Sequence, residues 1–89
     1  MMPYYVVTYD IGELRVNKVR KALKKYLHWV QNSVFEGELS VGKLQKCRQE
    51  LLKIIDLESD SVYFYVIENR SNLSKAVLGL EKEMTGNIF

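Results

Sequence analysis

The chain has 89 residues, of which 47% are hydrophobic and 27% are charged, and its formal net charge is +2. This length supports one hydrophobic core rather than two, so a single domain over residues 1–89 is expected. No apolar stretch approaches the roughly 18 residues that a membrane span needs, and the N-terminus lacks the order of a secretion signal. We therefore expect a cytoplasmic protein with no membrane segment, and the single cysteine, Cys47, excludes an internal disulfide.

The first predicted element is a strand over residues 4–10, which is rich in tyrosine and valine and ends at the break Ile11-Gly12. Its last residue, Asp10, is a lone acid at the point where the backbone turns toward a basic helix. Such an acid either caps the following turn or holds a metal beside a phosphate. From the residues alone the cap is favoured, because Asp is common at such junctions. One carboxylate is a poor Mg²⁺ site, so a metal here would need a second copy of the chain to supply the partner ligand.

The second predicted element is an amphipathic helix over residues 13–27. Its apolar residues recur at three- and four-residue steps, at Val16, Val19, Leu23 and Leu27. Between residues 15 and 25 there are six basic residues and no acid. This cationic side is either a solvated helix face or a surface that binds phosphates, and the residues alone favour neither.

The rest of the chain predicts a strand region, a helix and a further strand. Residues 28–39 are read as two short strands or one kinked strand, because Asn32-Ser33 and Gly37 interrupt them. Ser40 is a good cap for a helix that runs toward residue 55. Residues 61–67 form another strand, and residues 76–80 fit a strand or a helix equally well.

This order of elements is that of the split β-α-β arrangement, an α+β fold in which both helices cover one face of an antiparallel sheet. The other face is left without cover. Tyrosines at positions 4, 5, 9, 63 and 65 alternate along two neighbouring strands, so some of them lie on that face. They either stack on RNA bases or pack against a second copy, and the second is favoured because residues 61–67 lack the glycines of RNA-recognition strands.

Residues 6–11, 16–27, 30–39 and 60–65, taken in this order, resemble the CRISPR-associated protein 2 family. These are small dimeric ferredoxin-like proteins of prokaryotic adaptive immunity. The resemblance implies a ferredoxin-like βαββαβ sandwich with an additional C-terminal strand, assembled as a homodimer. Asp10 of each subunit would share a divalent cation, Mg²⁺, and the protein would be a metal-dependent endonuclease that cleaves single-stranded RNA or double-stranded DNA.

The resemblance also implies that basic residues near the first helix contact phosphates. The nearest matches are Arg15, Lys18, Arg20 and Lys21. Trp29 stands where relatives often have an arginine, and a tryptophan suits a sheet and can stack on a base or sugar. His28 is interpreted as structural rather than as a ligand.

The C-terminal residues 77–89 resemble a segment that adds a strand to the partner's sheet, so residues 79–89 are expected to pack on the partner subunit. The family works in spacer acquisition, where its dimer binds duplex DNA together with the CRISPR-associated protein 1 integrase. Two alternatives remain: a non-catalytic dimeric adaptor that holds DNA for the integrase, and a toxin-type ribonuclease of similar fold.

Overall fold

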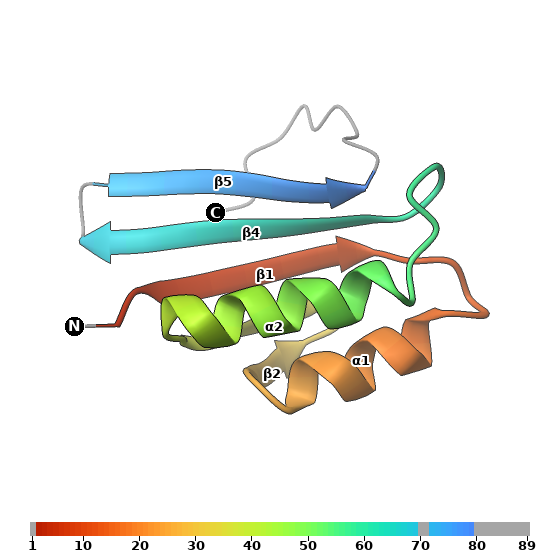
Figure 1. Ribbon diagram of the computed structural model, residues 1–89, viewed down its shortest axis with the longest axis horizontal. Coiled ribbons are helices and arrows are strands. Elements are labelled where there is room, and N and C mark those ends of the chain that lie inside the picture. Colours follow the sequence, from red (N-terminus) through yellow and green to blue (C-terminus); the bar gives the residue numbers. More distant parts are fainter. Residues whose placement is uncertain (1, 70–71, 80–89) are drawn as a thin grey trace.

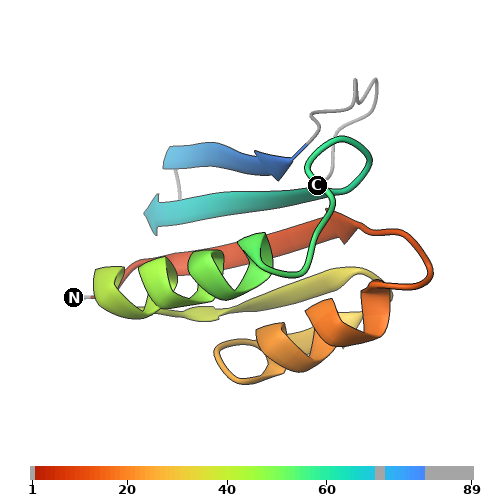
Figure 2. The same ribbon diagram turned by 45° about the vertical axis from the view of Figure 1, so that its right-hand side comes forward.

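The computed structural model describes residues 2–69 and 72–79 of the chain. Its elements in this range are β1 (Tyr4–Asp10), α1 (Val16–Lys24), β2 (His28–Gln31), β3 (Val34–Glu38), α2 (Val41–Leu52), β4 (Ser61–Asn69) and β5 (Asn72–Gly79). The strands form one antiparallel sheet in the order β2-β3-β1-β4-β5, and both helices lie on one face of it (Figure 1, Figure 2). The predicted α+β class, its βαββαβ order and the additional C-terminal strand are confirmed.

The core lies between the sheet and the two helices, because alternate residues of the central strand β1 face them. Tyr5, Val7 and Tyr9 are buried, whereas the residues between them are only partly buried. Phe35 from β3 and Phe64 from β4 flank β1 in this core. A sheet in which every second side chain meets a helix leaves the intervening side chains on the opposite face.

Helix α1 begins later and ends earlier than the pattern over residues 13–27 predicted. The carbonyl of Gly12 accepts from the backbone N–H groups of Arg15, at 2.9 Å, and Val16, at 3.0 Å, so a turn precedes the helix. At its other end, N–H groups of residues 25 and 26 bond to carbonyls three positions back, which tightens the last turn. The predicted apolar stripe is confirmed, because Val19 and Leu23 are completely buried.

Residues 28–39 contain two strands, as the first of the two interpretations held. The turn between β2 and β3 passes through Asn32, whose φ of 41° lies in the left-handed region that asparagine tolerates. Ser40 caps α2 as predicted, since its Oγ accepts from the backbone N–H of Lys43 at 3.2 Å. Helix α2 ends at Leu52, before the expected limit near residue 55.

The C-terminal strand β5 pairs along β4 of the same chain, from Asn72 opposite Asn69 to Gly79 opposite Ser61. The open choice between strand and helix for residues 76–80 is thereby decided for residues 76–79. Residues 77–79 lie in this intrachain strand, although the resemblance placed them in a segment that pairs with the partner. Residues 80–89 lie outside the described residues, and their packing on a partner stays a prediction. No helix in the described ranges is long and apolar enough to cross a bilayer.

Candidate nucleic-acid and metal site

Asp10 is the last residue of the central strand β1, and its side chain is exposed. Because its neighbour Tyr9 is buried under the helices, Asp10 lies on the opposite face of the sheet. Thr8 and Val6 share this helix-free face with it, one and two alternations earlier. The structure thus places the predicted catalytic carboxylate at the end of the face that was expected to meet a second copy.

Ser61 lies directly opposite Asp10 in the pairing of β1 with β4. Its side chain faces the same side of the sheet, because the next residue, Val62, belongs to the core. Ser61 is completely buried, and its Oγ has no hydrogen-bond partner in the described part of the chain. Directly opposite residues of an antiparallel pair have Cβ atoms about 5 Å apart, so a buried hydroxyl without a partner stands beside the carboxylate.

Ser61 could not be predicted as a site residue from the sequence, because a serine at the start of a strand belongs to no recognisable motif. Only the register of β1 against β4 brings it to Asp10. Oxygen atoms from a carboxylate and a hydroxyl are ligands that a hard cation accepts. Within the described residues, no group of three or more His, Cys, Asp or Glu side chains gathers to hold a metal, so a site at Asp10 would need further oxygens from a second copy or from water.

The loop that follows Asp10 is attached to the start of β4 through Asp60, which is 1% exposed. Its carboxylate accepts from the backbone N–H of Gly12 at 2.8 Å and from that of Asp56 at 2.9 Å. It also accepts two bonds from Arg15, Nε at 2.6 Å and Nη2 at 2.9 Å. The Arg15 hydrogen bond, more than any other cause, holds the pKa of Asp60 well below its ordinary value of 3.8, although burial acts in the opposite direction.

Arg15 was predicted to contact phosphates, and the structure brings it to Asp60 instead of leaving it in solvent. Its bidentate pair with Asp60 is joined by a longer contact to Ser59 Oγ at 3.4 Å. The guanidinium side chain is still 31% exposed. Its contact with a nucleic acid stays a prediction, while its part in holding the loop behind Asp10 is visible in the geometry.

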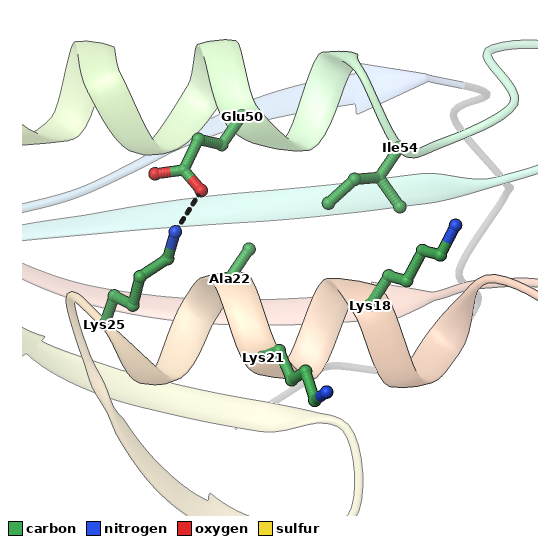
Figure 3. Close-up of a pocket in the computed structure, with 6 residues that line it drawn as sticks. All are labelled: Lys18, Lys21, Ala22, Lys25, Glu50 and Ile54. Carbon is green, nitrogen blue, oxygen red and sulfur yellow. Dashed lines mark hydrogen bonds and ion pairs between the residues drawn. The ribbon is translucent and has the colours of Figure 1, made fainter.

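Lys18 and Lys21 line a groove of about 530 Å³ between α1 and α2, together with Ala22, Lys25, Glu50 and Ile54. Lys18 and Lys25 reach toward α2, whereas Lys21 projects along α1 and away from α2 (Figure 3). Lys25 Nζ pairs with Glu50 at 2.5 Å, and the Tyr26 hydroxyl donates to the same carboxylate. That hydrogen bond is the largest of the causes that raise the pKa of Tyr26 to about 12.

Arg20 lies on another side of α1, over the edge strand β2. Its Nε donates to the Tyr9 hydroxyl at 3.1 Å, and its Cζ is 5.6 Å from the centroid of the Trp29 ring. Lys24 approaches the same ring, with Nζ 5.0 Å from the centroid. His28 is exposed on this edge strand. Among the described residues it belongs to no group of His, Cys, Asp or Glu side chains that could hold a metal.

The predicted site residues therefore fall into two groups on opposite sides of the sheet. Asp10 lies on the helix-free face with Ser61, whereas Lys18, Arg20 and Lys21 belong to the helix layer. Arg15 lies between the two groups, in the loop that joins β1 to α1. An anion that follows the helix layer would thus meet lysines without necessarily reaching Asp10.

Comparison with known proteins gives consistent matches over most of the chain. Residues 1–75 match the family model described as CRISPR associated protein Cas2. A protein of Thermodesulfovibrio yellowstonii named CRISPR-associated endoribonuclease Cas2 3 is 71% identical over 99% of this chain and 100% of its own length. A CRISPR-associated endoribonuclease Cas2 of Thermotoga maritima is 48% identical over 97% of this chain and 99% of its own.

Two solved structures are also similar. One, described as a crystal structure of cas2, superposes with a TM-score of 0.73 at 42% identity and covers 100% of both chains. The other is a hypothetical protein, TT1823, from Thermus thermophilus. It has a TM-score of 0.73 at 33% identity, over 78% of this chain and 85% of its own.

Proposed function

This chain belongs to the Cas2 family of CRISPR-associated proteins, and from that premise we propose that it is a Mg²⁺-dependent endonuclease of CRISPR adaptation. It acts as a homodimer in the cytoplasm and cleaves phosphodiester bonds of single-stranded RNA or double-stranded DNA. The two relatives named above are called endoribonucleases, and they match this chain over nearly its whole length.

The observation that carries this proposal is the pairing of Asp10 with Ser61 at the end of the helix-free sheet face. The exposed carboxylate and the buried hydroxyl without a described partner offer two kinds of oxygen on adjacent strands. A twofold axis close to Asp10 would add the same two groups from the second copy. Asp10 is not the cap of α1, because it ends its strand several residues before that helix and Arg15 is the N-cap, and carboxylate and hydroxyl oxygens are ligands that a hard cation accepts.

In this proposal the residues of each chain bind the metal and the nucleic acid and hold the Asp10 carboxylate in position. Asp10 would hold the divalent cation, which when bound would stabilise the charge at the phosphate and lower the pKa of bound water. The bonds from Gly12 and Arg15 to Asp60 fix the loop behind Asp10, so the carboxylate keeps its place at the strand end. The basic residues of the helix layer, Lys18, Arg20 and Lys21, bind the backbone of the nucleic acid.

A second function is favoured by the separation of the lysines from Asp10. Lys18 and Lys21 lie in the helix layer, across the sheet from the carboxylate. A duplex bound there would be held through its phosphates, with little sequence preference and a steep dependence on salt. In that case the dimer is a DNA-binding adaptor for the CRISPR-associated protein 1 integrase during spacer acquisition, and Asp10 is dispensable.

Cleavage assays separate the two functions. Labelled single-stranded RNA and duplex DNA are incubated with wild-type protein or with Asp10→Ala, in Mg²⁺ or in chelator. The endonuclease requires cleavage by the wild type in Mg²⁺ alone, with a loss of at least about 100-fold in Asp10→Ala. The variant Glu58→Gln, which removes an exposed acid elsewhere, serves as the matched control.

Equal cleavage by wild type and Asp10→Ala would point to a contaminating nuclease and contradict the catalytic assignment. Retained binding of duplex DNA by both proteins without any cleavage would support the adaptor. A loss of duplex binding on Lys18→Ala and Lys21→Ala, with cleavage of RNA unchanged, would place the two activities on separate surfaces.

A further inference from the structure

Trp29 is a large aromatic side chain on the exposed edge of the sheet. Strand β2 is the outermost strand of the order β2-β3-β1-β4-β5, and all four of its residues are exposed. Trp29 keeps 48% of its surface accessible. A planar ligand can stack on an indole that is half exposed beside a basic helix.

The ring is held in one orientation by hydrogen bonds at its rim. Its Nε1 donates to the backbone carbonyl of Asn32 at 2.8 Å, and the Tyr9 hydroxyl donates to the same carbonyl at 3.2 Å. Arg20 contacts both side chains, because its Nε donates to that Tyr9 hydroxyl and its guanidinium lies over the indole. On its inner side the ring lies nearly parallel to Phe35, with centroids 6.4 Å apart.

Two cations lie over this ring, Arg20 Cζ at 5.6 Å and Lys24 Nζ at 5.0 Å from its centroid. They come from successive turns of α1, so they mark out a line along the helix beside the indole. Arg20 is tied to Tyr9, whereas Lys24 is exposed and has a flexible stem. A base that stacks on the indole displaces these cations from above the ring, and the adjacent phosphates then pair with them.

We propose that Trp29, flanked by Arg20 and Lys24, is a stacking site for an unpaired base of single-stranded nucleic acid, with the two cations on the adjacent phosphates. This inference rests on the proposed function only in taking nucleic acid as the ligand. A base inside a duplex is stacked on both neighbours and presents no free face, so the site favours single strands and unpaired ends. It also provides a contact on the helix side of the molecule that does not involve Asp10.

The protein reports on this site directly, because Trp29 is the only tryptophan in the chain. The probe is a 12-nucleotide oligo(dT), titrated into wild-type protein in chelator while Trp29 emission is recorded. A blunt duplex of the same length is titrated in parallel. We expect saturable quenching by oligo(dT) and much weaker quenching by the duplex, since only the two end pairs of a duplex present a free base face.

Variants then show how much each side chain contributes to the affinity for oligo(dT), which is measured by the fluorescence anisotropy of a labelled oligonucleotide. Trp29→Ala is expected to lose affinity at least about five-fold, and Trp29→Phe to retain most of it, because stacking on a ring is the interaction removed. Lys24→Ala is expected to lower the slope of log affinity against log salt by about 0.7, the share of one phosphate contact on a single strand. The exposed Lys46 of α2 gives the matched control, Lys46→Ala, with an unchanged slope.

The inference is overturned if oligo(dT) does not bind, if it binds without quenching Trp29, or if the duplex quenches equally well. It is also overturned if Trp29→Ala lowers the melting temperature but leaves the affinity unchanged, because the indole then only protects the sheet edge. These results are independent of cleavage, since chelator is present throughout. Quenching of Trp29 in a protein that shows no nuclease activity in Mg²⁺ would support this site and refute the endonuclease. Nuclease activity without quenching would support the endonuclease and refute this site.

Discussion

At the scale of single residues, Asp60 shows how a buried charge organises the surroundings of Asp10. Its two oxygens accept from two backbone N–H groups and twice from Arg15, so the carboxylate is surrounded by donors. Desolvating a carboxylate is costly, and here the cost is offset only because every donor is in place. Removing the charge therefore affects both the stability of the fold and the loop behind Asp10.

The variant Asp60→Asn tests this role. An amide of the same shape places an NH₂ group against at least one donor and leaves Arg15 without its counter-charge. We expect the free energy of unfolding to fall by about 2–4 kcal/mol, measured by urea denaturation at neutral pH. Glu13→Gln, which changes an exposed acid in the same loop, is expected to stay within about 0.5 kcal/mol of wild type.

The pH dependence of stability at acid pH is a second test of the pair formed by Asp60 and Arg15. The pKa of Asp60 is lower in the folded protein than its ordinary value of 3.8, so its contribution is complete above that pH and is lost as pH falls below it. The stability difference between wild type and Asp60→Asn should therefore narrow between pH 4 and pH 2. A difference that stays constant over this range would mean that the charge of Asp60 is not what stabilises the loop.

At the scale of elements, the last strand depends on a glycine at its end. Gly79 has a φ of +94°, and a Cβ at this position would lie 2.2 Å from the backbone oxygen of Asp60. Both the conformation and the contact involve backbone, so no side-chain rotation relieves them. The junction of β5 with the start of β4 therefore accepts no side chain at residue 79.

We expect Gly79→Ala to lower the free energy of unfolding by about 2–4 kcal/mol, from the positive φ and the clash together. Gly42 in α2 is the matched control, because a Cβ there would meet no atom within 4 Å. Gly42→Ala should stabilise the protein by about 0.5–1 kcal/mol, as alanine loses less backbone freedom in a helix. Thermal or urea unfolding of both variants measures these effects, and a neutral Gly79→Ala would contradict the close approach of residue 79 to the Asp60 backbone.

The elements themselves were largely predictable from the sequence. Strand β1 and the apolar stripe of α1 follow from periodicity, which depends on residues close together in the chain. The helix ends were predicted less well, because the bonds around Gly12 and the tightened turn after Lys24 stop α1 inside its amphipathic pattern. The choice of a strand for residues 76–79 required β4 beside them.

At the scale of the whole molecule, the proposed dimer predicts a link between metal and association. If two Asp10 carboxylates face each other, their like charges oppose dimer formation until a cation lies between them. We expect Mg²⁺ to tighten the wild-type dimer several-fold in sedimentation equilibrium at constant ionic strength. Asp10→Asn should dimerise more tightly than wild type in chelator and should not respond to Mg²⁺.

A wild-type dimer constant that is the same in Mg²⁺ and in chelator, and the same in Asp10→Asn, would contradict a shared cation. It would leave the separate question of cleavage to the nuclease assay. The measurement uses association rather than activity, so it tests the position of Asp10 even in a protein that cuts nothing.

The sequence by itself determined the order of strands and helices as far as β4, the faces that they bury and the family resemblance. The elements and their buried faces depend on local propensity and periodicity, which neighbouring residues set, whereas Asp10 as a candidate ligand followed from the resemblance. The tertiary structure alone decided that Arg15 pairs with Asp60, 45 positions away, that Ser61 stands opposite Asp10, and that the lysines lie across the sheet from that carboxylate. Such juxtapositions depend on strand register and on the paths of loops, because residues distant in the chain meet only when the sheet has formed.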